Sequence, residues 1–333
     1  MSTSNTFNQK EKWVCTVVHP KKAAQGKPEN LPVAFIQENK LGTAITDLSS
    51  DPDESIPTTG TKEAVYSELE TIVQSLDRND IDYAIIKSVL PISKQIGDID
   101  ILVSDLPATE SVLESFGYDC ESHQPFKRKY SRITDLGRTA VHVHDKIAWH
   151  GQTYLDKIKI LENTVMGEYP RGEVAVPCPS HEASIIAAHM LFEKANNRIL
   201  LLDVLCYWVW YHNDDLDLEL MHSMADEYGW EFGLRCFLAG VADVYEQVYD
   251  EPFDSDNTLK TMAEFSVPYN RIYGTFLISF RQMYSIRKHR LEWLARNEDV
   301  RSTAHCFQTY VRDFVTELTN RYGFTYTKKR LRQ

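Results

Sequence analysis

Gly97-Asp98-Ile99-Asp100-Ile101-Leu102-Val103 is the stretch that decides how this chain folds. Side chains alternate between the two faces of a β-strand, so Asp98 and Asp100 project from one face and the branched apolar residues from the other. Two adjacent carboxylates repel each other and are costly to bury unpaired, so such a pair coordinates a cation or lies at a solvated sheet edge. Because hard oxygen ligands favour Mg²⁺ or Mn²⁺, the stretch predicts either a metal site or a solvated edge strand.

The residues around this strand predict a compact unit of alternating helices and strands. Apolar residues recur at helical spacing between 64 and 76, and a strand follows at 83–86. Pro107 to Phe116 has helical character and ends before a glycine. Two further strands are expected at 126–133 and 139–147, which gives a sheet with helices packed on it.

The rest of the chain divides at a rigid segment, Pro177-Cys178-Pro179-Ser180, beyond which almost every stretch is predicted to be helical. The aromatic run at 207–211 adjoins an aliphatic stripe and is predicted to be bundle core rather than a base-stacking platform. Before residue 60, strand-like runs at 13–18 and 33–36 predict a hairpin or a strand added to the main sheet. We therefore expect three parts: an N-terminal extension and linker (1–60), an α+β catalytic domain (61–178) and a helical domain (179–333).

Composition predicts a globular, cytoplasmic protein. No apolar run approaches the roughly 20 residues that span a bilayer, and residues 1–12 are polar without an apolar signal core, so no membrane partner is expected. The six cysteines lie far apart and lack Cys-x-x-Cys spacing, which predicts buried reduced thiols rather than zinc ligands or disulfides.

Charge is unevenly distributed along the chain. The net charge of −12 argues against a protein that coats nucleic acid non-specifically. Residues 281–333, however, contain twelve Lys or Arg and five Asp or Glu, a net charge of +7, whereas the preceding residues carry −19. This basic C-terminal end is either a surface for RNA, a polyphosphate or an acidic partner, or an ordinary charged helix surface.

Lys87-Ser88, followed about ten residues later by the Asp-x-Asp strand, resembles the polymerase-β-like nucleotidyltransferase superfamily, and within it the uncharacterised nucleotidyltransferase family. The likeness covers roughly residues 80 to 250, where His181 to Asp203 resembles the family's His-bearing helix and Arg-x-x-x-x-Asp segment. The resemblance implies an α+β fold, in which a polymerase-β-like nucleotidyltransferase core with a mixed sheet is followed by an all-helical C-terminal domain.

Two positions depart from the family pattern. The family's Gly-Ser turn is Lys87-Ser88 here, so the glycine that lets the backbone approach phosphate is absent. A third metal-binding carboxylate is expected on the strand that contains residues 141–144, and its position holds His142, with Asp145 displaced along the chain. Either His142 ligates Mn²⁺, or Asp145 turns inward, or the site has lost catalysis.

The resemblance implies a metal-dependent nucleotidyltransferase, which moves a nucleoside monophosphate from a nucleoside triphosphate to an acceptor hydroxyl and releases pyrophosphate. Mg²⁺ or Mn²⁺ would be bound by Asp98, Asp100 and His142, and Asp145 is a further candidate for the catalytic set. The acceptor is open among a small molecule, a protein hydroxyl and an RNA end. The remaining candidates fall into two groups: for phosphate binding Lys87, Ser88, Gly97, Lys127 and Lys129, and for the acceptor side His144, His189, Arg198 and Asp203.

Two alternatives stand beside this hypothesis. The missing glycine and the missing third acid are also typical of a nucleotide-binding pseudoenzyme with the same fold. A toxin-type interaction module that modifies or grips a partner is the second alternative. Single residues have plainer interpretations too, because Lys127 and Lys129 can solvate an edge strand and His189 can pack inside a helix bundle.

Overall fold

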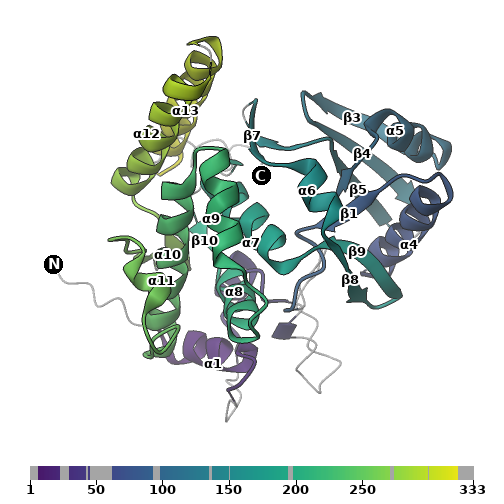
Figure 1. Ribbon diagram of the computed structural model, residues 1–333. Helices are drawn as coiled ribbons and strands as arrows, with labels where there is room; N and C mark the ends of the chain where they lie inside the picture. The colour runs from purple at the N-terminus through teal and green to yellow at the C-terminus, as the bar shows by residue number, and fades with distance from the viewer. Residues whose placement is uncertain are drawn as a thin grey trace.

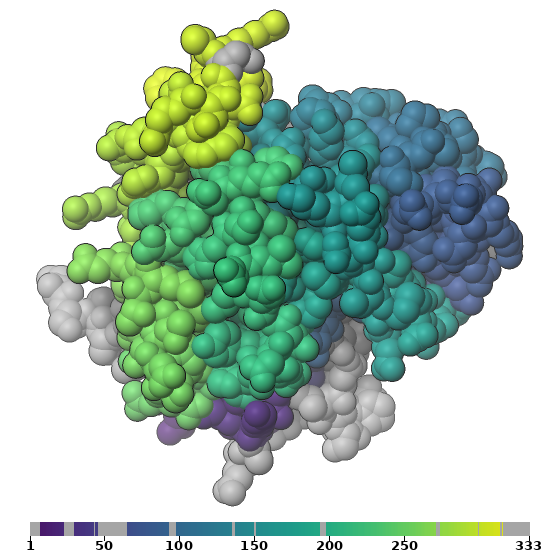
Figure 2. Space-filling model, in the orientation of Figure 1, coloured from purple at the N-terminus to yellow at the C-terminus, as the bar shows by residue number. Residues whose placement is uncertain are grey.

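A computed structural model describes residues 7–22, 30–42, 44–45, 62–92, 98–134, 137–149, 151–193, 198–270, 274–298 and 300–321. A part built on a β-sheet lies beside a helical part, and a pair of long helices stands at one end of the molecule (Figures 1 and 2). None of the helices in these ranges combines the length and the apolar character that a membrane crossing requires.

A five-stranded mixed sheet in the order β1-β2-β5-β4-β3 forms the centre of the first part. The pair β2 and β5 is parallel, and the other neighbouring pairs are antiparallel. Helices α4 (Lys62–Arg78) and α5 (Leu106–Ser115) cover one face (Figure 1). The strands are β1 (Tyr83–Ile86), β2 (Ile99–Val103), β3 (Asp119–Gln124), β4 (Lys127–Thr134) and β5 (Gly137–His144).

Alternation along β2 directs its side chains into two different cores. Ile99, Ile101 and Val103 pack with apolar residues of α4 and α5, whereas Leu102 belongs to the core shared with the helical part. Asp100 lies on the same face as Leu102, because side chains two residues apart point the same way. The predicted metal-binding face is therefore directed toward the helical part.

Two hairpins and a short helix connect the sheet to the helical part, and the sequence had not predicted them or strand β3. The connecting elements are β6 (Ile147–Trp149), β7 (Gln152–Leu155), α6 (Lys157–Glu162), β8 (Thr164–Tyr169) and β9 (Gly172–Pro177). Strands β6 and β7 are short, β3 and β8 are largely exposed, and β9 is buried only at its end, so none has the long apolar run that signals a strand.

The C-terminal part is helical as predicted, with one small sheet inside it. This sheet has the order β10-β12-β11 and is formed by β10 (Arg198–Ile199), β11 (Tyr269–Asn270) and β12 (Thr275–Leu277). Strands β11 and β12 occupy part of the stretch that was predicted to be helical, and the next helix begins only at Phe280. The helices are α7 (Pro179–Ala188), the π-helix η1 (His189–Glu193), α8 (Leu201–His212), α9 (Leu218–Glu227), α10 (Glu231–Tyr249), α11 (Thr258–Thr261), α12 (Phe280–Asn297) and α13 (Val300–Arg321).

The aromatic run of α8 lies in the core of the helical part, as predicted. Tyr207, Trp208 and Trp210 are all buried there. The tyrosine ring lies 5.5 Å from the ring of Phe237 in α10, and Trp208 stacks on Tyr245 of the same helix. A base-stacking platform would require exposed rings, so this run packs helices together.

The two strands predicted near the N-terminus are helices, so that prediction is wrong. They are α1 (Gln9–Val18) and α2 (Val33–Glu38). In α1 a capping box overrides the strand propensity of the valine-rich run, because Asn8 accepts the N–H groups of Lys10 and Glu11 and Glu11 accepts the N–H of Asn8. Both helices pack into the core of the helical part.

Candidate active site

Polar side chains form rows across the sheet face that is directed toward the helical part. Asp100 of β2 is in register with His142 of β5, which is in register with Lys129 of β4. In the next row His144 is opposite Lys127. Directly opposed residues on neighbouring strands project from the same face. Strand pairing thus brings together candidates from three separate segments of the sequence.

Asp98, Asp100 and His142 form a cluster that can hold a divalent cation. Each offers one ligand atom, and the three atoms lie within 4.8 Å of one another. The Nδ1 atom of His142 is 3.2 Å from Asp98 Oδ2 and 3.5 Å from Asp100 Oδ1. Asp100 is buried, whereas the side chain of Asp98 is 48% exposed, so the cluster is open to solvent on one side. Two carboxylates and an imidazole suit Mn²⁺, and the carboxylates also suit Mg²⁺.

Asp145 lies outside this cluster. Its Oδ1 atom is 2.8 Å from the Nζ atom of Lys157, and its N–H donates to the carbonyl of Phe126. Of the two candidates for the third ligand, His142 is therefore the one that the fold places beside Asp98 and Asp100.

Asp100 is ionised because cationic and hydrogen-bonding groups surround it. Lys87 Nζ and His144 Nε2 lie 3.1 Å and 2.8 Å from its Oδ1 atom. Burial alone raises the pKa of Asp100, but the ammonium of Lys87 and the hydrogen bonds from His142 and His144 hold it well below its usual range. Burial lowers the pKa of His144 to about 4, so its neutral ring donates the Nε2 proton to the carboxylate near pH 7.

Lys87 adopts the backbone conformation that glycine adopts most easily. Its φ angle is 58°, in the left-handed region, directly after β1. Its N–H donates to Oε1 of Glu182, a buried acid of α7, while its side chain reaches Asp100. Burial acts to lower the pKa of Lys87, but the negative charges of Asp100 and Glu193 raise it overall. The turn that lacks the expected glycine thus keeps a glycine-like shape, with Ser88 buried beside it.

Two glutamates of the helical part contact this network, and sequence reasoning missed both. Glu182 accepts the Lys87 N–H, and Glu193 at the end of η1 lies 3.4 Å from Lys127 Nζ and 2.8 Å from His189 Nε2. Burial raises the pKa of Glu193, but the charges of Lys87 and Lys127 lower it overall. A signal was present in the sequence, because each is an acid in an otherwise apolar, buried helical segment.

The other predicted site residues have separate surroundings. Lys129 pairs with Glu121 of β3 at 3.2 Å. Arg198 forms an ion pair with Glu38 of α2, and Asp203 is buried in the first turn of α8. Gly97 lies outside the described residues. Of the acceptor-side candidates, His144 and His189 therefore lie within the network around Asp100 and Glu193.

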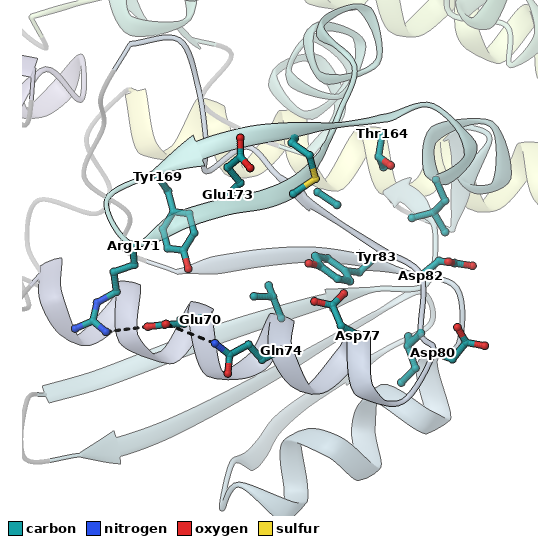
Figure 3. Close-up of a pocket in the computed structure, with 15 residues that line it drawn as sticks. Glu70, Gln74, Asp77, Asp80, Asp82, Tyr83, Thr164, Tyr169, Arg171 and Glu173 are labelled. Atoms are coloured by element: carbon teal, nitrogen blue, oxygen red, sulfur yellow. Dashed lines mark hydrogen bonds and ion pairs between the residues drawn. The ribbon is translucent and has the colours of Figure 1, made fainter.

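A separate acidic groove lies between α4 and the β8–β9 hairpin (Figure 3). Its volume is about 440 Å³, and none of the described residues predicted for the site lines it. Arg171 is bound to Glu70 at 2.9 Å. The lining repels a polyphosphate because it is rich in carboxylates: Glu70, Asp77, Asp80, Asp82 and Glu173.

Fold and residue cluster together define a nucleotidyltransferase-like protein with a candidate metal centre. Residues 58–246, more than half of the chain, match the family described as "Uncharacterised nucleotidyltransferase", and the chain belongs to this family. The family and the fold class predicted from the sequence are thereby confirmed. An antigenic nucleotidyltransferase-like protein from Paracoccidioides brasiliensis is 17% identical, with a TM-score of 0.29, over 39% of this chain and 66% of that chain. No curated protein matches the sequence.

Proposed function

We propose that this protein is a metal-dependent nucleotidyltransferase, which transfers a nucleoside monophosphate from a nucleoside triphosphate to an acceptor hydroxyl. The observation that carries the proposal is the cluster of Asp98, Asp100 and His142, whose ligand atoms lie within 4.8 Å of one another in a chain of this family. The donor set fits Mn²⁺ and accepts Mg²⁺.

In this reaction the acceptor oxygen bonds to the α-phosphorus, and the bond from that phosphorus to the bridging oxygen breaks. Pyrophosphate leaves with the electron pair, and the acceptor hydroxyl loses its proton to water. Bound Mg²⁺ or Mn²⁺ supplies charge stabilisation for the attacking and leaving oxygens. The residues of the chain that would hold the cation are Asp98, Asp100 and His142.

The neighbouring residues prepare the site for this chemistry. Lys87 and His144 fix the carboxylate of Asp100 and keep it ionised. Lys127 and Lys129 share the face of the sheet that carries the cluster, and we assign them, with Lys87 and Ser88, to the phosphates of the triphosphate. Glu182 holds the Lys87 turn in its left-handed conformation by accepting its N–H.

Nucleotide binding without catalysis is the second candidate function. Histidine stands where a third carboxylate is expected, and Lys87 already neutralises Asp100. A site of this composition can bind a triphosphate and fail to stabilise the charge that develops during transfer.

The test compares the protein with three asparagine variants. Each α-labelled nucleoside triphosphate is incubated with Mg²⁺ or Mn²⁺, and pyrophosphate release and labelled products are measured. Asp98→Asn and Asp100→Asn should lower turnover by about 100-fold or more, because each removes charge from the metal site. Asp145→Asn is the matched control and should change turnover little, because Asp145 pairs with Lys157 outside the cluster.

Two results would decide against the leading proposal. Turnover that survives both substitutions would contradict the assignment of the site. Triphosphate binding that depends on both acids, with no pyrophosphate release under any condition, would favour the nucleotide-binding protein without catalysis.

A further inference from the structure

A cavity of about 600 Å³ lies between the sheet-based part and α13, the last described helix. The turn between β3 and β4 contributes Phe126, and β6 contributes Trp149. His305 and Arg312 of α13 line it from the C-terminal side. A volume of this size accommodates a small organic ligand.

The cavity adjoins the candidate active site through two shared residues. Lys127 and Glu193 line the cavity and are bound to each other at 3.4 Å. Lys127 is also opposite His144 in the sheet, and His144 donates to Asp100. A ligand in the cavity would therefore lie beside the residues proposed to bind the triphosphate and the metal, which is where an acceptor must lie.

Trp149 points to a ligand independently of this position. It is only 7% exposed, and its indole N–H has no hydrogen-bond partner among the residues that the structure describes. The ring is held by Tyr154 and His189, with ring centroids 5.4 Å and 5.9 Å away. A buried donor without an acceptor is costly, so a ligand that supplies an acceptor would be favoured here.

The wall of the cavity that α13 forms is packed against β7 and α12. Thr309 and Tyr310 of α13 are buried, and the Tyr310 hydroxyl lies 3.3 Å from that of Tyr154 in β7. The guanidinium of Arg287 in α12 lies 5.0 Å from the Tyr310 ring centroid. Because α13 lies beyond residues 58–246, it is an element that this chain adds to the part matched by the family.

We propose that this cavity is the acceptor site and that it binds a nucleotide unit; this proposal rests on the function proposed above. The base lies against Phe126 and accepts the indole N–H of Trp149, and the phosphate is bound by Arg312. Lys127, assigned above to the triphosphate, lies at the boundary between the two sites. Aromatic faces next to cationic side chains suit a base and its phosphate. A sugar would need several free polar groups, whereas Glu193 is already bound to Lys127 and His189, and the Thr309 hydroxyl donates to the carbonyl of His305.

A nucleotide unit can be a free nucleotide or the 3′ end of an RNA, and binding of both is measured by calorimetry. The probes are 5′-AMP and a six-nucleotide RNA, each measured without metal and again in Asp98→Asn, so that the binding detected does not depend on the metal centre. Arg312→Gln and Phe126→Ala should each weaken binding about tenfold, by loss of the phosphate contact and of a stacking face. Arg301→Gln, an exposed arginine of the same helix away from the cavity lining, is the matched control and should bind as the parent does.

The outcomes separate this proposal from the proposed function. Binding of 5′-AMP or RNA that persists in Asp98→Asn and without metal, and is weakened by Arg312→Gln, supports the acceptor site even if no transfer is detected. With labelled triphosphate added, a dinucleotide product identifies a free nucleotide as the acceptor, and an RNA longer by one residue identifies the RNA end.

Two results overturn the acceptor site. Competition between 5′-AMP and the triphosphate for one site, with binding unaffected by Arg312→Gln, would show that 5′-AMP binds the triphosphate site and not the cavity. Failure of both probes to bind a protein with unchanged thermal unfolding would show that the cavity takes no nucleotide.

Discussion

Lys87 combines a constrained backbone with a buried charge at one position. A non-glycine residue with a φ of 58° costs roughly 1–2 kcal/mol relative to glycine, and the chain accepts this cost directly after β1. The N–H bond to Glu182 and the ammonium of Lys87 on Asp100 offset it. The side chain of a lysine is therefore used at a point where the backbone alone would favour glycine.

Replacing Lys87 should reverse the usual order of alanine and glycine. Both Lys87→Ala and Lys87→Gly leave Asp100 without its ammonium partner, so both should lower the free energy of unfolding, by about 3 kcal/mol for alanine. Glycine should be about 1 kcal/mol less damaging because it adopts the left-handed turn without strain. Urea unfolding of the two variants measures the difference. An alanine variant as stable as the glycine variant would show that the turn is not strained.

At the same scale, the sequence predicted the three residues that the fold brings together as a candidate metal cluster, but not the glutamate that contacts Lys87. The period of two along a strand is a local property, so it placed Asp98 and Asp100 on one face, and the expected facing strand supplied His142. Glu182 lies 95 residues from Lys87 in the chain. Its contact depends on how α7 packs against the sheet, and no local pattern encodes that packing.

Strand β5 gives two histidines of the same face different surroundings. His142 contacts Asp98, which is exposed, whereas His144 is buried against Asp100. His142 and His144 lie in adjacent rows of the sheet, and only the row of His142 reaches the open side of the cluster.

An aspartate should be tolerated at position 142. His142→Asp restores the acid expected at this position and should shift metal preference toward Mg²⁺, raising Mg²⁺ affinity about tenfold, because a hard oxygen replaces the imidazole. Calorimetric titration with Mg²⁺ and Mn²⁺ gives the ratio of the two affinities. His144→Asp, one row away, is the control, and it should destabilise the protein by placing a second buried acid beside Asp100. An unchanged ratio in His142→Asp would argue that His142 is not a ligand.

The type of an element was predicted correctly where its apolar pattern was long. It was predicted wrongly where the apolar run was short and a helix-capping motif preceded it. The strands β1, β2, β4 and β5 and the helices α4 and α5 were all anticipated. The run from Trp13 to Val18 has strand-like composition, yet the capping box at Asn8 and Glu11 and burial of one helical face make it helical. Packing of this segment against helices far away in the sequence outweighs its strand propensity. A single sequence does not reveal such packing.

Across the whole molecule, α1 is attached to the helical part through a buried histidine. The Nε2 atom of His19 lies 3.0 Å from the Tyr245 hydroxyl of α10, and its ring centroid lies 4.7 Å from that of Trp208 in α8. Its Nδ1 atom accepts the N–H of Lys21, which requires an unprotonated nitrogen. Burial, aided by the charge of Lys22, lowers the pKa of His19 from 6.5 to about 4.

This pKa shift should make the stability of the whole chain depend on pH. Between pH 6.5 and about 4 the unfolded chain binds a proton at His19 and the folded chain does not, so the free energy of unfolding should fall as pH falls through this window. The full loss is at most about 3.5 kcal/mol, since one pKa unit corresponds to roughly 1.4 kcal/mol. Urea unfolding from pH 7 to pH 4.5 measures it. His19→Gln should reduce the slope by up to one proton, because glutamine can hydrogen-bond to Tyr245 without titrating.

The matched control is His123→Gln, which replaces an exposed imidazole of β3 outside both cores. The slope of unfolding free energy against pH should stay unchanged in this variant and should flatten only in His19→Gln. If both variants kept the slope of the parent protein, α1 would not depend on a neutral His19 for its attachment. Other buried groups, such as the neutral His144, would then account for any loss of stability in acid.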